Sequence, residues 1–322
     1  MGYKSLILVI LLATRVCAET TFDPLSLAIG ARALGMGGAC TAVADDAGAL
    51  FNNPAALGEI DKVKVTSTSA NLLDEVNCVV LGGVLPFGDR FAAGLGYAGA
   101  YVTGIELRDA NGTLLSRSNY GSSALVLALG QKLSERTSVG LSLKYFYSNG
   151  SEIVDSNGRG WNLDLGLLQS GWNWLKFGVV GQNLLVGNRI AYAGGAEEPL
   201  PLTVKAGLRC YLLGNGYDSA FAAPLEISLA ADADSYPQSS RPADYHGGIE
   251  ISPASSFTLR AGLDGSNPTA GLSLRFAGLG FHYAYHPNAD FAGGAVNYFS
   301  LSYDEAGFPR EPEVPDVYLA AR

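Results

Sequence analysis

Short segments in which apolar and polar residues alternate follow one another along most of the chain. Around Ser142, for example, Leu141 and Leu143 belong to a run of apolar residues at every second position. Successive residues of a β-strand point to opposite faces, so each such segment has one apolar and one polar face. The pattern predicts fourteen strands, at residues 63–71, 77–85, 91–105, 120–133, 138–147, 161–168, 175–186, 202–212, 225–232, 245–251, 257–263, 269–276, 280–285 and 295–303.

The polar faces of the predicted strands carry charges of both signs, which favours a membrane barrel. In such a barrel the apolar faces lie against lipid, and a shared lumen keeps the charges paired or wet. The connections also tend to alternate between short and long, as in outer-membrane proteins. The sequence therefore predicts an all-β fold, a transmembrane antiparallel β-barrel of about fourteen strands. The residues expected to face its lumen are Lys144, Asp164, Lys205, Arg209, Glu226, Glu250, Arg260, Arg275 and His282.

The same alternation leaves a second fold open. In a soluble periplasmic β-sandwich the apolar faces would form a core instead of facing lipid, and membrane fractionation would separate the two folds. Phe146 and Leu168 are apolar residues at positions expected to face the lumen, but the sequence shows no continuous apolar stripe there. An apolar pocket in the lumen would favour transport of hydrophobic molecules.

A segment rich in glycine and alanine, residues 30–57, precedes the first predicted strand. Its small residues allow close packing in a confined space, which predicts a compact plug (a hatch) inside or under the barrel. Asp45 and Asp46 precede a short apolar run, as residues at a helix N-terminus do. The plug residues singled out as candidates are Arg32, Gly35, Gly37, Gly38, Asp45, Asp46, Asn53, Pro54 and Ala55.

The charged residues of the plug need partners, because burying an unpaired charge is costly. Arg32, Asp45 and Asp46 are expected to pair with one another or with lumen groups such as Arg260 and Glu250. These pairs either hold the plug in place or let it shift to open a path, with the Asn-Pro-Ala triplet at residues 53–55 as the hinge. Replacing Asn53 should distinguish the two roles, because only the second role alters ligand passage without unfolding the barrel.

The two ends of the chain differ from the rest. Residues 1–18 combine Lys4, a short apolar run and small residues before Glu19, which predicts a cleaved signal peptide. The predicted organisation is then a plug at residues 19–60, a barrel at 61–306 and a proline-rich tail at 307–322. The tail is expected to be flexible and periplasmic, because its prolines favour an extended path.

The composition supports a membrane barrel and excludes a nucleic-acid binder. The chain has 48% hydrophobic residues and 41 glycines, and its mean hydropathy is +0.17. Its net charge is −9, with no basic patch that could contact nucleic acid. Three cysteines remain after the signal peptide, with spacings that suggest neither a disulfide framework nor a zinc site.

Motifs of enzyme chemistry are missing or out of context. Residues 94–99 match the dinucleotide-binding pattern GxGxxG, but they lie within a predicted strand and do not open a helix. His282 and His286 lie four residues apart on one strand, about 13 Å, which is too far for one metal ion. They are expected on a solvated lumen face. We therefore expect no enzyme activity, no cofactor and no metal.

The plug sequence GARALGMGGACTAVADDAGALFNNPAAL, residues 30–57, resembles the N-terminal signature of the PorV/PorQ group of bacterial outer-membrane proteins. These are relatives of the FadL-like transporters of hydrophobic compounds, and the triplet Asn53-Pro54-Ala55 is the part shared with that wider superfamily. Weaker similarity continues at residues 178–184, 200–208 and 246–303. The resemblance implies a barrel of about fourteen strands with an N-terminal hatch, located in the bacterial outer membrane.

Two functions follow from this resemblance. PorV-like members imply a non-enzymatic scaffold or shuttle for secreted proteins, and this is the first expectation because the signature is closer to that group. The alternative is a FadL-like transporter of hydrophobic small molecules. The implied partners are outer-membrane lipid and either secreted-protein cargo or hydrophobic ligands, without nucleic acid.

Overall fold

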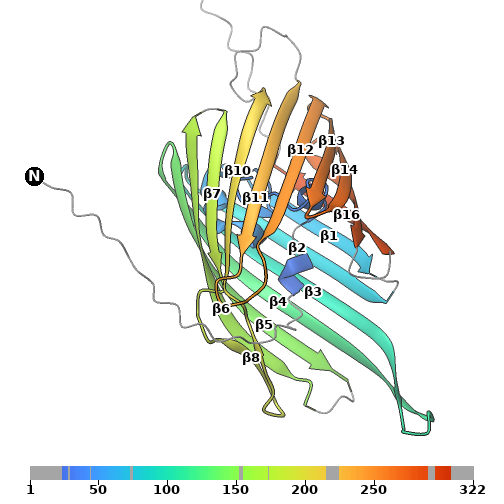
Figure 1. The fold of residues 1–322 in the computed structure, drawn as a ribbon. Coiled ribbons are helices and arrows are strands. Elements are labelled where there is room, and N and C mark those ends of the chain that lie inside the picture. The colour runs from blue at the N-terminus through green and yellow to red at the C-terminus, as the bar shows by residue number, and fades with distance from the viewer. Residues whose placement is uncertain are drawn as a thin grey trace, which may run out of the picture.

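The computed structural model describes residues 24–27, 30–43, 45–72, 75–151, 155–172, 174–214, 225–288 and 294–305. Fourteen antiparallel strands in this part of the chain form a closed barrel, as predicted (Figure 1). Sequence neighbours pair in the sheet, and β1 pairs with β16 to close it. The barrel strands are β1 (Lys64–Leu72), β2 (Val76–Phe87), β3 (Phe91–Arg108), β4 (Leu114–Ser134), β5 (Thr137–Gly150), β6 (Gly158–Trp172), β7 (Leu175–Gln182), β10 (Thr203–Leu213), β11 (Glu226–Ser235), β12 (Asp244–Ala254), β13 (Phe257–Asp264), β14 (Asn267–Phe276), β15 (Leu279–Asn288) and β16 (Gly294–Asp304).

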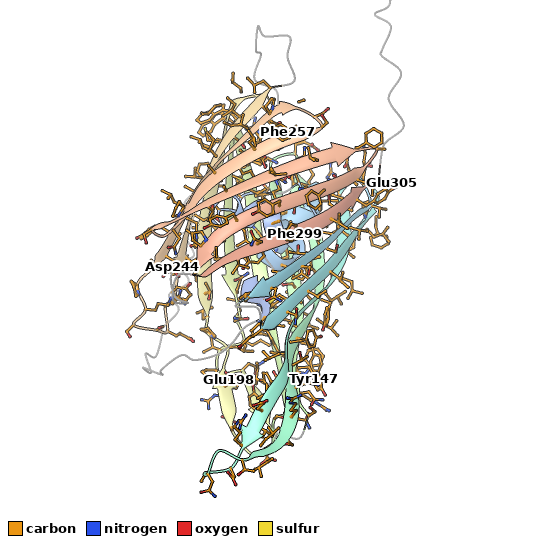
Figure 2. All side chains as sticks on the ribbon, turned by 90° about the vertical axis from the view of Figure 1, so that its right-hand side faces the viewer. Tyr147, Glu198, Asp244, Phe257, Phe299 and Glu305 are labelled. Atoms are coloured by element: carbon orange, nitrogen blue, oxygen red, sulfur yellow. The ribbon has the colours of Figure 1, made fainter. Side chains whose placement is uncertain are left out.

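The side chains of each strand alternate between an exposed outer face and a buried lumen face. On β5, Leu141 and Leu143 are exposed, whereas Ser142, Lys144 and Phe146 are buried. Large apolar side chains project outward around the whole barrel (Figure 2). An apolar outer face on a closed antiparallel barrel is the architecture of proteins of the bacterial outer membrane, so the predicted membrane barrel is confirmed over the soluble sandwich.

The two ends of the barrel differ in their connections. The turn end carries the short β2–β3, β4–β5, β12–β13 and β14–β15 turns, together with the start of β1 and the end of β16. The opposite end, the loop end, carries the projecting β3–β4 hairpin seen at the lower right of Figure 1. In outer-membrane barrels the short turns face the periplasm and the longer loops face the outside.

Two predicted loops at the loop end contain strands. Most of residues 106–119, predicted as a loop, belongs to β3 and β4, which continue past the bulge that follows Val102. In the predicted loop at 187–201, β8 (Arg189–Tyr192) and β9 (Glu197–Pro199) form a small hairpin attached to β6. The alternation did not reveal these strands because outside the membrane no lipid requires an apolar face.

The helices that the structure describes before β1 lie inside the barrel (Figure 1). These are η1 (Pro24–Leu27), α1 (Gly30–Leu34), α2 (Ala49–Asn52) and η2 (Pro54–Glu59). We call residues 30–60 the plug. Helix α2 begins later than expected, because Gly48 occupies the N-cap and Asp46 instead accepts a hydrogen bond from the Gly48 amide at 2.8 Å.

Several further predictions concern the limits of the plug and the barrel. The signal peptide at 1–18 and the tail at 307–322 lie outside the described residues. No helix in the described ranges is long and apolar enough to cross a bilayer. Among the described residues, Cys40, Cys78 and Cys210 are free thiols.

Candidate functional site

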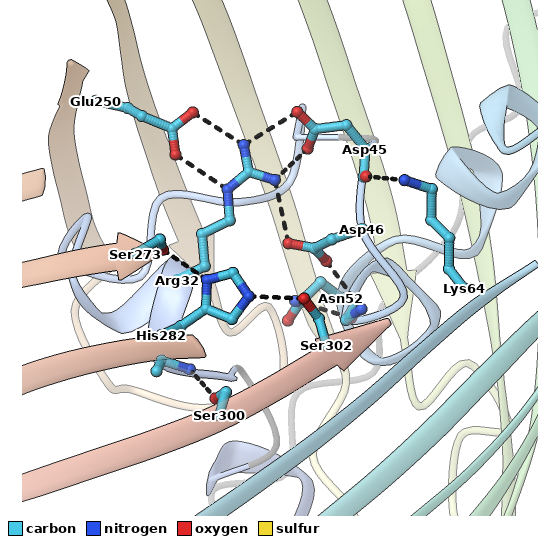
Figure 3. Close-up of polar contacts among 12 residues, drawn as sticks. Arg32, Asp45, Asp46, Asn52, Lys64, Glu250, Ser273, His282, Ser300 and Ser302 are labelled. Carbon is cyan, nitrogen blue, oxygen red and sulfur yellow. Dashed lines mark hydrogen bonds and ion pairs between the residues drawn. The ribbon is translucent and has the colours of Figure 1, made fainter. Parts of the chain in front are cut away.

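Arg32 of α1 is the centre of an ion-pair network between the plug and the barrel wall (Figure 3). Within the plug, its guanidinium pairs with Asp45 and lies 3.2 Å from Asp46 Oδ2. Toward the wall it makes a bidentate contact with Glu250 of β12, with Nε and Nη2 at 3.0 and 2.9 Å from the two carboxylate oxygens. The predicted pairing of the three plug charges with one another and with Glu250 is therefore found.

Glu250 joins Arg32 to two further arginines of the wall. Arg209 Nη2 of β10 donates to its Oε1 at 2.9 Å, and Arg260 Nε of β13 donates to its Oε2 at 2.6 Å. Arg209 also reaches Asp45 Oδ2 at 3.0 Å. Glu250 is almost fully buried, so its charge depends on these guanidinium groups. The network thus connects β10, β12 and β13 of the wall to two parts of the plug, Arg32 of α1 and Asp45.

Asp45 shows how the network sets protonation within the plug. Partial desolvation of its half-exposed carboxyl opposes ionisation, but the Arg32 and Arg209 guanidiniums outweigh this effect and hold the pKa of Asp45 well below its usual range. The pKa of Arg32 is raised well above its usual value, since three carboxylates outweigh the desolvation of the guanidinium. These charges therefore persist through the whole neutral and mildly acidic range.

Other contacts fix the rest of the plug against β10–β13. Asp232 of β11 accepts hydrogen bonds from the backbone amides of Cys40 and Thr41 at 2.8 and 2.7 Å. His246 Nδ1 of β12 lies 2.9 Å from the carbonyl oxygen of Gly37. The sequence did not point to Asp232 as a plug contact, although its position on a lumen face next to Asp234 was visible.

The Asn-Pro-Ala triplet forms the corner between α2 and η2. Asn53 is fully buried; its Nδ2 donates to the Thr41 carbonyl at 2.8 Å and to the Leu167 carbonyl of β6 at 3.3 Å. Its Oδ1 accepts from the Ala55 amide at 3.1 Å and thereby caps η2. Asn53 therefore connects two parts of the plug and links them to the wall. Its role as a hinge stays a prediction.

Glycines at lumen-facing positions let the plug touch the backbone of the wall. A Cβ atom on Gly140 of β5 would lie 2.2 Å from the Pro54 carbonyl carbon, and one on Gly166 of β6 would lie 2.1 Å from Asn53 Oδ1. Six strands contribute such glycines, which we call the glycine seat: Gly130, Gly140, Gly166, Gly178, Gly248 and Gly262. This seat was not predicted from the sequence, although each glycine lies on the lumen face of a predicted strand.

Plug glycines make the complementary approach. Gly37 has a φ of +68° and packs on the backbone of Leu263, where a Cβ would meet three atoms within 2.7 Å. Gly38, with a φ of +88°, faces the His246 ring, and Gly35 packs on Gly271 of β14. The left-handed conformation and the close contacts together require glycine at positions 37 and 38.

One side of the lumen wall is lined by small apolar side chains, which we call the apolar arc. This arc covers the inward faces of β2–β4 and the loop-end halves of β1, β15 and β16. The prediction that no continuous apolar stripe exists was therefore wrong. The buried residues of the arc are Ala70, Leu72, Cys78, Val80, Val84, Ala92, Ala98, Ala100, Ala124, Val126, Ala128, Ala284, Val296 and Tyr298.

The plug contacts this arc through apolar side chains. Leu50, Phe51 and Leu57 pack among the arc residues of β2–β4. On the other side, Ala31 and Leu34 of α1 pack against the arc near its junction with β15 and β16. The plug is thus bound to β10–β13 by charges and hydrogen bonds and to the apolar arc by apolar packing.

The remaining predicted lumen residues lie apart from the plug network or at its edge. Lys144 and Asp164 form a buried ion pair of 2.7 Å between β5 and β6, and Lys205 pairs with Asp234 at 2.5 Å. Glu226 lies 3.7 Å from Arg209. Arg275 faces a polar pocket of about 390 Å³ at the turn end, together with Arg32, Asp46 and His282.

The sequence predicts His282 and His286 on a solvated lumen face, whereas in the structure both are held by hydrogen bonds. His282 is buried, with Nδ1 2.5 Å from Ser273 Oγ and Nε2 2.8 Å from Ser302 Oγ. His286 Nε2 lies 2.8 Å from Asp264 Oδ2. The part of the chain that the structure describes contains no cluster of three or more residues able to hold a metal ion.

We expect the thiol of Cys40 to report on the seating of the plug. Burial raises the pKa of Cys40 well above its usual range, and the nearby carboxylate of Asp232 raises it further. In a Cys78→Ala/Cys210→Ala background at pH 8, the rate of maleimide modification of native protein should be lower than that of urea-unfolded protein by a factor of roughly ten or more. The rate should rise only at more alkaline pH, because the thiolate is the attacking species. Equal rates in the two states would contradict the seated plug.

Comparisons with known proteins place the fold. No family model matches the chain, and no curated protein matches its sequence. Among solved structures, the CymD monoaromatic hydrocarbon channel has a TM-score of 0.58 at 15% identity, over 88% of this chain and 98% of that one. The Pseudomonas putida toluene transporter TodX has a TM-score of 0.55 at 13% identity, over 91% and 99% of the two chains. A Pseudomonas aeruginosa FadL homologue has a TM-score of 0.53 at 13% identity, over 85% and 98%.

At these identities the similarity establishes the barrel fold alone. It agrees with the outer-membrane location that the apolar outer face indicates. The narrower resemblance to the PorV/PorQ group is not confirmed by any of these comparisons, whereas the FadL-like fold is.

Proposed function

We propose that this protein is an outer-membrane channel for hydrophobic small molecules, gated by its plug. The observation that carries the proposal is the apolar arc, which gives one side of the lumen a lining of mainly Ala and Val side chains without charges. A polar solute gains nothing from such a lining, whereas an apolar one is stabilised by about 25 cal/mol per Å² of surface removed from water. The similar folds of a monoaromatic hydrocarbon channel and a toluene transporter support the same class of ligand.

The two-sided attachment of the plug suggests how passage occurs. An apolar ligand can replace Leu50 and Phe51 against the arc without separating Arg32 from Glu250. The plug then shifts away from the arc while its ion pairs retain it in the barrel. The triplet at residues 53–55 is the expected hinge, because Asn53 lies between the apolar and the polar contacts of the plug.

A scaffold for secreted proteins is not favoured by a specific feature of the described residues. Such a role requires an exposed surface for protein cargo, and the large exposed apolar side chains are distributed around the membrane band. The transporter therefore remains the function that the contacts of the plug and lumen support best.

The proposal predicts that filling the arc blocks uptake. In a bacterial host that lacks its own channels of this type, the protein should increase uptake of radiolabelled oleate or toluene above an empty vector. Cys78→Phe places a large ring against Ala100 and Tyr298 in the arc, and we expect about a tenfold loss of uptake, in line with the cost of overpacking.

Val79→Phe is the matched control, because Val79 follows Cys78 on β2 but points outward. It should leave uptake unchanged, and heat-modifiable migration on gels should show that both variants form barrels. No uptake by the unmodified protein, or equal losses in the two variants, would refute the channel.

A further inference from the structure

A groove of about 670 Å³ lies on the outer face of β3–β5 near the loop end. Its walls are aromatic and polar but uncharged: Tyr97, Tyr101, Tyr147, Asn119, Asn149 and Thr103 line it. The barrel register places these residues in adjacent rows, with Tyr101 beside Gly121 and Asn149, and Gly99 beside Ser123 and Tyr147. The groove is therefore built into the sheet and is independent of the plug and of the proposed channel.

Two glycines shape the floor of this groove. A Cβ atom on Gly121 would lie 2.7 Å from the Tyr101 ring. One on Gly99 would lie 2.5 and 2.8 Å from the hydroxyl oxygens of Tyr97 and Tyr101. The two tyrosines thus lean over glycine backbone, and their rings offer flat surfaces on an outward face that otherwise carries leucines.

The groove lies where the outer leaflet meets water. Phe91 marks the turn end of β3, and Tyr101 follows ten residues later on the same face. At the usual rise and tilt this separation is about 25 Å along the barrel axis, the height of the apolar band of an outer-membrane barrel. Tyr147 lies toward the same end (Figure 2). The polar residues of the groove are therefore at headgroup level.

A cation stands beside the groove. Arg159 of β6 is the register partner of Tyr147 and projects from the same outer face. It is exposed, and no ion pair is found for it among the described residues. On the next outward row, the rings of Tyr145 and Trp161 are in contact at a tilted angle, with centroids 4.4 Å apart. The groove thus combines aromatic faces, amide and hydroxyl groups, and one free guanidinium.

An apolar groove of about 590 Å³ continues from it toward the turn end. The two share Tyr97, and the second is lined by outward side chains such as Leu81, Leu95, Leu125 and Leu301. Gly83, where a Cβ would meet nothing within 4 Å, keeps it open. One continuous surface is therefore polar and aromatic at headgroup level and apolar within the membrane.

We propose that this surface binds a single glycolipid of the outer leaflet, with its saccharide on Tyr101 and Tyr147, a phosphate at Arg159 and an acyl chain running past Tyr97. Sugar rings present C–H faces that pack on aromatic rings and hydroxyls that bond to Asn and Thr side chains. A guanidinium suits a phosphate. A plain phospholipid matches only the cation and the apolar groove.

Native mass spectrometry of the detergent-purified protein tests this assignment. After incubation with deep-rough lipopolysaccharide (two Kdo sugars on lipid A), we expect one bound molecule, retained in preference to phosphatidylglycerol. Tyr101→Ala/Tyr147→Ala should reduce the bound fraction about tenfold, as expected from losing two aromatic contacts. Tyr245→Ala/Tyr285→Ala removes two outward tyrosines elsewhere on the barrel and should leave it unchanged.

Arg159→Gln keeps the proposal testable if the double tyrosine variant does not fold, because this exposed side chain is not needed for packing. It should weaken retention of the phosphorylated glycolipid but not that of its dephosphorylated form. Equal retention of phosphatidylglycerol, or equal losses in both tyrosine pairs, would overturn the proposal. Equal binding of the free Kdo-containing oligosaccharide would also overturn it and would assign the groove to a soluble sugar.

Discussion

Replacing Arg32 with alanine is expected to unseat the plug while the barrel remains folded. The substitution removes the plug's contacts with Glu250 and leaves Asp45 and Asp46 without their shared guanidinium. Breaking a buried ion pair costs about 3–5 kcal/mol. We expect the lower end, about 3 kcal/mol, because Glu250 keeps Arg209 and Arg260. Planar-bilayer recordings should show a rise in conductance, and maleimide should modify Cys40 faster.

Arg108→Ala is the matched control for this experiment. Arg108 pairs with Glu106 on the projecting β3–β4 hairpin, where both side chains are well exposed. Exposed pairs contribute at most about 1 kcal/mol, so neither conductance nor Cys40 modification should change. If Arg32→Ala conducts no better than Arg108→Ala, the ion pairs do not hold the plug. If it also abolishes heat-modifiable migration, they are needed for the barrel itself.

Gly140→Val should displace the corner of the plug at residues 53–55. The added Cβ would lie 2.2 Å from the Pro54 carbonyl carbon and 2.3 Å from the Ala55 amide nitrogen. Backbone atoms cannot rotate away as a side chain does, so we expect the upper part of the 1–3 kcal/mol range for overpacking, about 3 kcal/mol. Protease added to the purified protein should then cleave within the plug, where the unmodified protein resists.

Gly83→Val is the corresponding control, because a side chain there enters open space on the outer face of β2. Valine suits a strand better than glycine does, so this variant should be at least as stable as the unmodified protein. Protease resistance in both variants would mean that the plug is not seated against Gly140. Equal sensitivity in both would indicate a general effect of valine on the barrel.

The barrel strands could be predicted because lipid imposes a strict alternation on them. β13, for example, is predicted at 257–263 and observed at Phe257–Asp264. The prediction fails at the loop end, where β3 and β4 extend beyond the membrane into water. There Glu106 and Arg117 pair across the hairpin on an exposed face. Without lipid on one side, the period-two pattern that marks a strand is lost.

The pairing of the plug charges could also be predicted, because charges among small residues need partners. Their common centre at Glu250 could not, since it depends on which strands of the closed barrel face α1. The apolar arc was missed for two reasons. Its residues are small, such as Ala100 and Ala284, and they belong to strands from opposite ends of the chain that meet only when β1 pairs with β16.

The glycine seat was missed for a different reason. Glycine on a lumen face carries no signal by itself, because a strand with Gly140 or Gly166 reads like any other glycine-rich strand. Its meaning appears only when a second backbone, here that of the Asn53–Ala55 corner, occupies the place of the missing side chain. Close backbone approach involves two segments, and the residue pattern of one strand describes only one of them.

The contacts of the plug also constrain the order in which the protein can assemble. Arg32 precedes β1, whereas its partner Glu250 belongs to β12, 218 residues later in the chain. Ala31 donates its amide proton to Ser300 of β16, the last strand. Contacts over such separations form late, because closing long loops costs entropy first. We therefore expect the plug to adopt its final conformation only after the barrel has closed. In an insertion intermediate whose β1–β16 seam is still open, Arg32 is expected to remain exposed to water.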